Sequence, residues 1–248
     1  MNARFAFDLE RLRDAGGGKA DGGEVCGSMT VGGADEAGRG CLAGPLVAAA
    51  VSFDYADWDE ARFAALDRLN DSKKLAPARR EKLFATVVTM ARQIVVVSGA
   101  PGSIDRRGLH VCNLQALSRV LEGLRPMPAL AFVDGFRLRD CAAPHEALIG
   151  GDTRSAAVAA ASIVAKVTRD RLMRSLASRY PFWGFAEHFG YATQQHQAAI
   201  CEHGICELHR LSFNSVAYQQ LGLAPQSAAA SFLVENGDRA SEAGLIVL

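Results

Sequence analysis

The stretch Val31-Gly32-Gly33-Ala34-Asp35-Glu36-Ala37-Gly38-Arg39-Gly40 sets two adjacent carboxylates at the end of an apolar run and follows them with glycines around an arginine. Two neighbouring acids at a strand end can hold a hard divalent cation. A glycine-flanked arginine lets backbone N–H groups and one cation approach a polyanion closely. The stretch therefore indicates acid chemistry on a phosphate backbone, although an isolated Asp-Glu pair is also common at solvated strand ends.

The apolar runs along the rest of the chain predict an α/β fold. We expect strands at 31–35, 46–53, 94–98, 129–133 and 146–149, and helices over 60–92 (interrupted at 71–75), 109–124 and 155–179. Residues 1–28 contain glycine clusters and are expected to form a mobile N-terminal extension to a catalytic domain at 29–180. A helical C-terminal extension is expected at 181–220, followed by a disordered tail at 221–248.

Further acids come where other predicted strands end in glycine. Asp134 precedes Gly135, and Asp152 follows Gly150 and Gly151. Neighbouring strands of one sheet would bring these acids to Asp35 and Glu36. Four carboxylates suit Mg²⁺ or Mn²⁺, and two ions about 4 Å apart can clamp the attacking and leaving oxygens of phosphodiester hydrolysis. The alternative is that Asp134 and Asp152 only begin turns, where aspartate beside glycine is favoured.

Composition limits the class of protein. The 248 residues carry 27 basic and 27 acidic side chains, which argues against nucleic-acid binding through bulk charge. However, residues 154–179 hold six cations and a single acid, Asp170. The chain has no apolar run long enough for a membrane span and no secretory segment, and its six cysteines form no dense framework. We therefore expect a cytoplasmic protein with reduced thiols and no membrane partner, and we expect a monomer.

Several short motifs, in order along about residues 31–215, together resemble the bacterial ribonuclease HII family. Beyond the opening stretch they are Asp71-Ser72-Lys73-Lys74-Leu75, Val133-Asp134-Gly135, Gly151-Asp152, the run from Ala159 to Asp170, Gly190-Tyr191-Ala192-Thr193 and His209-Arg210-Leu211-Ser212-Phe213. The resemblance implies a ribonuclease H-like mixed sheet flanked by helices, with a C-terminal helical extension. It also implies hydrolysis of the RNA strand of RNA/DNA hybrids and incision 5′ of single ribonucleotides in duplex DNA, serving removal of misincorporated ribonucleotides and RNA primers.

The same resemblance assigns roles to individual residues. It makes Asp35, Glu36, Asp134 and Asp152 the metal ligands, and Gly38-Arg39-Gly40 the loop whose backbone reads the ribose 2′-hydroxyl. Tyr191 corresponds to the ring that packs on the sugar of the next, deoxy, nucleotide. Further contacts near the nucleic-acid backbone are implied for Lys73, Ser162, Lys166 and Arg169.

These assignments are chemically reasonable. Glycine-rich backbone can approach a 2′-hydroxyl, which both donates and accepts hydrogen bonds, without a side-chain clash. A flat tyrosine face fits a sugar that lacks this hydroxyl. Since metal-activated water makes the 2′-hydroxyl unnecessary as a nucleophile, we expect a 5′-phosphate and a 3′-hydroxyl as products.

Other interpretations remain open. A DNA junction or transposition nuclease can share the acidic fold. A non-catalytic hybrid-binding module is expected to lack at least one of the four acids, and none is missing. We do not expect zinc at Cys201, His203, Cys206 and His209, because the spacing lacks separated Cys and His knuckles.

Two further features bear on partners and binding. No sliding-clamp motif is found after residue 220. Cys41, Glu187, Phe189 and Ile205 depart from residues common in the family, which leaves the four acids intact but weakens the expectation of backbone binding near Tyr191.

Overall fold

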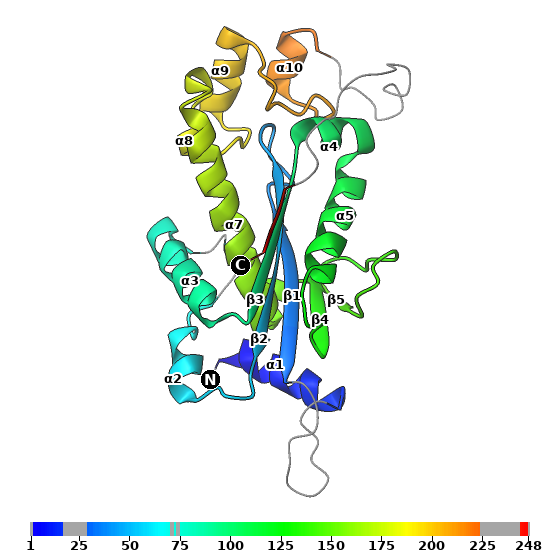
Figure 1. The fold of residues 1–248 in the computed structure, drawn as a ribbon. Helices are drawn as coiled ribbons and strands as arrows, with labels where there is room; N and C mark the ends of the chain where they lie inside the picture. The colour runs from blue at the N-terminus through cyan, green and yellow to red at the C-terminus, as the bar shows by residue number, and fades with distance from the viewer. Residues whose placement is uncertain (1, 17–28, 70–71, 73–74, 224–243, 248) are drawn as a thin grey trace, which may run out of the picture.

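The strand that carries the first two acids, β1 (Thr30–Ala37), lies inside a mixed sheet in the computed structural model (Figure 1). Within the part of the chain that the structure describes, the sheet has six strands in the order β5-β4-β1-β2-β3-β6. β1 pairs antiparallel with β2 and parallel with β4. The other strands are β2 (Leu46–Asp54), β3 (Gln93–Gly99), β4 (Leu130–Asp134), β5 (Glu146–Leu148) and β6 (Gly244–Val247). The structure describes residues 2–16, 29–69, 72, 75–223 and 244–247.

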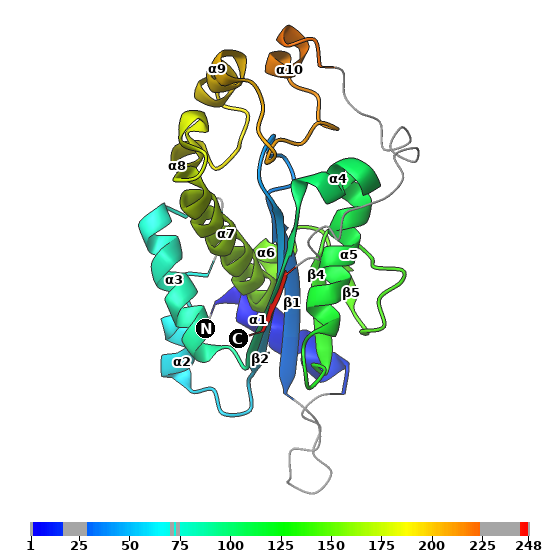
Figure 2. The same cartoon turned by 45° about the horizontal axis from the view of Figure 1, so that its top comes forward.

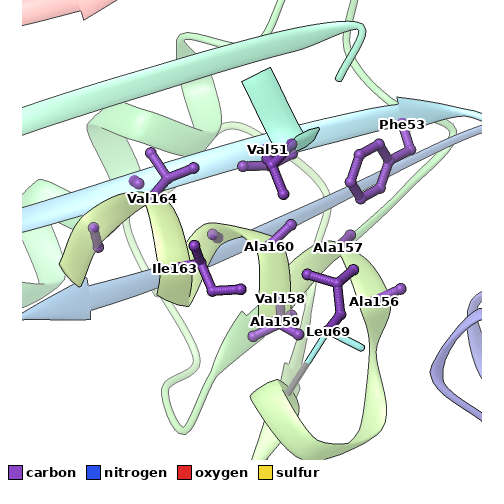
Figure 3. Close-up of a cluster of buried hydrophobic side chains, with 14 of the residues drawn as sticks. Val51, Phe53, Leu69, Ala156, Ala157, Val158, Ala159, Ala160, Ile163 and Val164 are labelled. Carbon is purple, nitrogen blue, oxygen red and sulfur yellow. The ribbon is translucent and has the colours of Figure 1, made fainter. Parts of the chain in front are cut away.

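The long helix α7 (Ala156–Ala177) packs closely on one face of the sheet. A Cβ placed on Gly33 would lie 2.2 Å from the carbonyl carbon of Ala157, so glycine in β1 and alanine in α7 are what permit this approach. Figure 3 shows the alanines of α7 with Ile163 and Val164 facing Val51 and Phe53 of β2. β1 is therefore held directly against the first turns of α7.

The opposite face of the sheet is covered by α5 (Leu109–Glu122), which follows α4 (Pro101–Arg107) across Gly108. Leu117, Val120 and Leu121 of α5 belong to a second buried cluster with residues of β2, β3 and β4. On the α7 side lie α2 (Glu60–Ala65) and α3 (Pro77–Met90), and α3 packs on α7 (Figure 2). The predicted mixed sheet flanked by helices is thus confirmed.

The N-terminal residues form a docked helix, α1 (Ala3–Asp14). The expectation of a mobile extension is therefore wrong for these residues. Phe5 and Leu12 are fully buried, and Phe5 contacts the rings of Tyr55 and Trp58. The buried Asp8 carboxylate accepts hydrogen bonds from the Tyr55 hydroxyl (3.0 Å) and the Ala157 N–H (3.1 Å). Residues 17–28 lie outside the described ranges.

The C-terminal extension is helical, as predicted. After the short turn at Pro181–Trp183 come α8 (Phe185–His188), α9 (Gln194–His203) and α10 (Val216–Gln220). Phe185 is fully buried and the Trp183 indole donates to the Gly204 carbonyl, so these aromatics pack within the extension. No helix among the described residues is long and apolar enough to cross a membrane.

Residues 244–247 correct the prediction of a disordered tail over 221–248. They form β6, which pairs antiparallel with β3 from Val95 to Ser98. Backbone groups at the edge of a sheet offer hydrogen bonds to any short extended segment, and the sequence Gly-Leu-Ile-Val has the apolar and β-branched character of a strand. Residues 224–243 are outside the described part of the chain.

Candidate functional site

The elements that carry Asp35, Asp134 and Asp152 lie next to one another at one end of the sheet. β1 and β4 run parallel with Ala34 opposite Val133, so Asp35 and Asp134 follow at corresponding places. Asp152 lies on α6 (Gly151–Arg154), a single turn that begins after Gly150 in the left-handed conformation. The Gly151 N–H donates to Asp134 Oδ1 at 2.7 Å. This hydrogen bond holds the start of α6 beside the end of β4.

The acids oppose one another's ionisation. Burial raises the pKa of Asp35 well above its ordinary value, and the charges of Glu36 and Asp134 raise it further. Burial also raises the pKa of Glu36, as does the charge of Asp134, whereas Arg39 and the Asn113 amide act in the opposite direction. Desolvated carboxylates that repel one another favour a bound cation, because a cation removes both penalties.

The chemistry of the donor set fits Mg²⁺ or Mn²⁺. All four candidate ligands are carboxylates, which are preferred by hard divalent ions. Glu36 Oε2 is buried and has no hydrogen-bond partner within the described residues, so this carboxylate oxygen is left for a cation to satisfy. Among those residues, no three acidic, histidine or cysteine side chains are already gathered into a group that would hold an ion.

The Gly38-Arg39-Gly40 loop follows β1 directly. Gly38 has φ of +95°, and a Cβ there would lie 2.1 Å from Arg169 Nε, so glycine is required. Gly40 is exposed, and nothing lies within 4 Å of the place where its Cβ would stand. Arg39 lies 3.4 Å from Glu36 and 4.8 Å from the centre of the Phe136 ring. The open backbone at Gly40 is thus next to the acids.

Arg169 does not have the predicted place beside a nucleic-acid backbone. Its side chain is fully buried and donates to the carbonyls of Pro45 (2.9 Å), Phe189 (2.9 Å) and Ala43 (3.0 Å). The sequence of a long helix does not show whether a basic side chain points to solvent or to the carbonyls of a neighbouring loop. Here Arg169 ties the loop after β1 to the segment that carries Tyr191.

Arg210 has a related role that the sequence analysis missed. It is fully buried and donates to the carbonyls of Gly44 (2.8 and 3.0 Å) and Arg39 (3.1 Å). Burial lowers its pKa to about 10. The motif from His209 to Phe213 was the available signal, because it pointed to this position without giving it a role.

Tyr191 lies on the open side of this loop. It is 37% exposed, and burial raises the pKa of its hydroxyl, as does the neighbouring Cys41 side chain. Lys166 Nζ stands 5.2 Å from the ring centre. An accessible aromatic ring therefore lies near the backbone of residues 40 and 41.

Two other predicted backbone contacts are engaged within the protein. Lys166 Nζ is paired with Asp170 at 2.8 Å, and its side chain is 13% exposed. The Ser162 hydroxyl donates to the Ser72 hydroxyl at 2.8 Å and lies beside Asp35, whose pKa it lowers. Ser162 thus links α7 to the acids, whereas Lys166 forms an ion pair within α7 itself. Lys73 lies outside the described residues.

Two neutral histidines, His196 and His209, are hydrogen-bonded in series to the backbone carbonyl of Tyr191. His196 Nδ1 lies 2.9 Å from the Tyr191 carbonyl, and its Nε2 lies 3.2 Å from His209 Nε2. The Cys206 N–H donates to His209 Nδ1 at 2.9 Å. Since a carbonyl only accepts and an N–H only donates, His196 carries its proton on Nδ1 and His209 on Nε2. Burial lowers the pKa of both rings to about 4.

The four residues considered for zinc engage different partners. Cys201 Sγ contacts Gln220 Oε1 at 3.0 Å, and His203 pairs with Glu202 at 3.8 Å. Cys206 and His209 contact each other as part of the same hydrogen-bonded series. The extension that they occupy thus positions Tyr191.

Comparison of the sequence with known proteins assigns this chain to a family. The family model described as Ribonuclease HII matches residues 32–216. A Ribonuclease HII from Salinispora arenicola is 49% identical over 187 residues, covering 75% of this chain and 68% of the relative.

Solved structures give the same result. The ribonuclease H2 from Pyrococcus horikoshii aligns with a TM-score of 0.63 at 28% identity, covering 78% of this chain and 97% of the other. The RNase HII of Archaeoglobus fulgidus, solved as a PCNA:RNase HII complex, also aligns with a TM-score of 0.63 at 28% identity, covering 75% and 96%.

Proposed function

Because the chain belongs to the ribonuclease HII family and is a ribonuclease H acting on RNA/DNA hybrids, we propose that it also incises duplex DNA on the 5′ side of a single embedded ribonucleotide, in a reaction that requires a divalent metal. Three neighbouring features carry this proposal: the buried acids at the end of β1, the open backbone at Gly40, and the partly exposed Tyr191 ring beside Cys41. Repair of misincorporated ribonucleotides and removal of RNA primers would both use such an incision.

The four carboxylates Asp35, Glu36, Asp134 and Asp152 would hold Mg²⁺ or Mn²⁺. Bound there, the ions would supply an activated water and neutralise charge on the scissile phosphate. Asp35 and Glu36 are ionised only at a cost in the absence of a cation, which supports a ligand role. Hydrolysis by water predicts a 5′-phosphate and a 3′-hydroxyl.

Recognition of one 2′-hydroxyl is assigned to the loop after β1. The Gly40 backbone is open to a ligand, and Arg210 and Arg169 hold the flanking carbonyls from inside the protein. A rigid, exposed backbone can both donate to and accept from the hydroxyl. Tyr191 presents an apolar ring to the following sugar, where an additional hydroxyl would be poorly accommodated.

The two rival functions are less well supported. A junction or transposition nuclease has no need of an open glycine backbone beside an aromatic ring. A non-catalytic hybrid-binding module would not need four acids, of which two, Asp35 and Glu36, have a pKa raised by burial and by neighbouring carboxylates. Family membership favours the ribonuclease over both.

A duplex with one ribonucleotide tests the proposal. We expect a nick 5′ of the ribonucleotide in Mg²⁺ or Mn²⁺, resolved on a denaturing gel, and no cleavage of the all-DNA duplex or in EDTA. Asp134→Asn should abolish the nick and also the rise in Tm that Mn²⁺ causes in the wild type, which tests metal binding without activity. An intact single-ribonucleotide duplex beside a cleaved long hybrid would contradict the proposal.

Tyr191 variants separate the ring from the fold in the same assay. Tyr191→Ala should lose more activity on the single-ribonucleotide duplex than on a long hybrid, because the hybrid offers other registers. Tyr191→Phe keeps the ring and should stay close to wild type. Equal losses on both substrates would mean that Tyr191 only packs against its neighbours.

A further inference from the structure

A groove lined by arginines opens beside the acidic site. It has a volume of about 750 Å³ and lies between residues of α4 and α5 and residues 135–140, which follow β4. Figure 1 shows how α4, α5 and the connection from β4 to β5 are arranged. The cationic lining of the groove comes from both walls: Arg107 and Arg119 on the helices, Arg137 and Arg139 on the connection after β4.

The groove adjoins the end of the sheet that carries the acids. Gly135 and Phe136 line it and directly follow Asp134 in the chain. The Phe136 ring lies 4.8 Å from the Arg39 guanidinium carbon and 5.8 Å, between ring centres, from His110 in the groove. A strand leaving the acids past Arg39 would therefore enter this groove.

The charges of the groove arginines are free to meet a ligand, although Arg107 already donates a hydrogen bond to the Gln115 side chain. All four are exposed, and none pairs with a carboxylate in the part of the chain that the structure describes. The one acid lining the groove is Asp140. Elsewhere on the surface, arginines are paired with carboxylates at 2.6 Å: Arg11 with Glu146, Arg92 with Asp54, and Arg171 with Glu81. The groove therefore carries an excess of positive charge, although the net charge of the whole chain is zero.

We propose that this groove binds the phosphate backbone of the substrate duplex, several nucleotides away from the scissile phosphate. This inference rests on the proposed function. Guanidinium groups offer planar pairs of N–H donors that match phosphate oxygens. Arginines on opposite walls suit a polyanion that lies between them. The groove would add phosphate contacts to a site in which Lys166 pairs with Asp170 and Arg169 donates to buried carbonyls.

The salt dependence of binding tests the groove independently of cleavage. Binding of a labelled single-ribonucleotide duplex is measured in EDTA between 50 and 200 mM salt, for wild type and for Arg119→Gln combined with Arg137→Gln. Each lost phosphate contact reduces the slope of log K against log[salt] by about 0.9, so the slope should fall by about 1.8 and binding should weaken roughly 10- to 30-fold at 0.15 M salt. The matched Arg→Lys pair should retain most of the slope.

Control variants make the result specific. Arg62→Gln combined with Arg68→Gln removes two exposed arginines near α2, on the other side of the sheet, and should leave the slope unchanged. Duplexes shortened from one end or the other should show that the groove variant weakens binding only when one particular end is long. An unchanged slope, or an equal fall in the α2 control, would overturn the proposal. If wild type binds with the expected slope but does not nick the duplex, the proposed function fails and the groove stands.

Discussion

Two glycines of one loop differ in the reason for which glycine is needed. Gly38 has a positive φ and faces Arg169, whereas Gly40 faces open space. We expect Gly38→Ala to lower the free energy of unfolding by about 2–4 kcal/mol, because the new methyl group displaces Arg169 from its carbonyls and the backbone is strained. Gly40→Ala should keep the Tm of wild type.

The effect of Gly40→Ala on activity should differ from its effect on stability. Gly40→Ala places a methyl group where the 2′-hydroxyl is proposed to approach, so it should reduce single-ribonucleotide nicking at least tenfold although the fold is intact. Thermal unfolding and initial rates on the same samples check both variants. A fully active Gly40→Ala enzyme would show that this backbone does not approach the substrate.

At the scale of elements, α1 is a structural part of the domain. Phe5→Ala should lower the free energy of unfolding by about 3–5 kcal/mol, because it leaves a cavity among Tyr55, Trp58 and Phe63. Urea unfolding followed by tryptophan fluorescence measures this change. The exposed Arg13→Ala on the same helix is the control and should change stability by less than about 0.5 kcal/mol. A loss below 1 kcal/mol for Phe5→Ala would mean that α1 docks weakly.

The elements show which features a sequence can predict. The neighbouring positions of Asp35 and Asp134 at strand ends were predictable because each acid ends an apolar run, which is a local pattern. Arg169 was misplaced because its three carbonyl partners come from segments more than a hundred, or twenty, residues away. The docking of α1 was missed although its short apolar pattern was visible, because the glycine-rich stretch after it suggested independence. β6 was missed because four residues give no periodicity.

At the scale of the whole molecule, the buried histidines predict how stability depends on pH. An unfolded histidine has a pKa near 6.5, and His196 and His209 have a pKa of about 4 in the folded protein. Between these values the unfolded state binds more protons, so stability is lost as the pH falls from 6.5 to 4. Each ring should cost about 2 kcal/mol between pH 7 and pH 5. His188, which stacks on His196, is shifted in the same direction.

Carboxyl groups with a raised pKa, which are Asp8, Asp35 and Glu36, oppose the histidines and must be subtracted in this measurement. Burial raises the pKa of Asp8 to about 7, so its contribution to stability is lost as the pH rises through 7. We therefore compare wild type with His196→Gln in urea unfolding at pH 7 and pH 5. The variant should lose about 2 kcal/mol less on acidification, and parallel losses would mean that His196 does not remain neutral in the native protein.

The last strand of the sheet has a consequence for behaviour at high concentration. β3 would otherwise present seven residues of unpaired backbone to other molecules, and an open edge of that length is a template for intermolecular strand pairing. β6 pairs with four of those residues, from Val95 to Ser98. The opposite edge of the sheet is β5, which has only three residues. By pairing with this part of β3, residues 244–247 shield it from strand pairing with other molecules, which would favour aggregation.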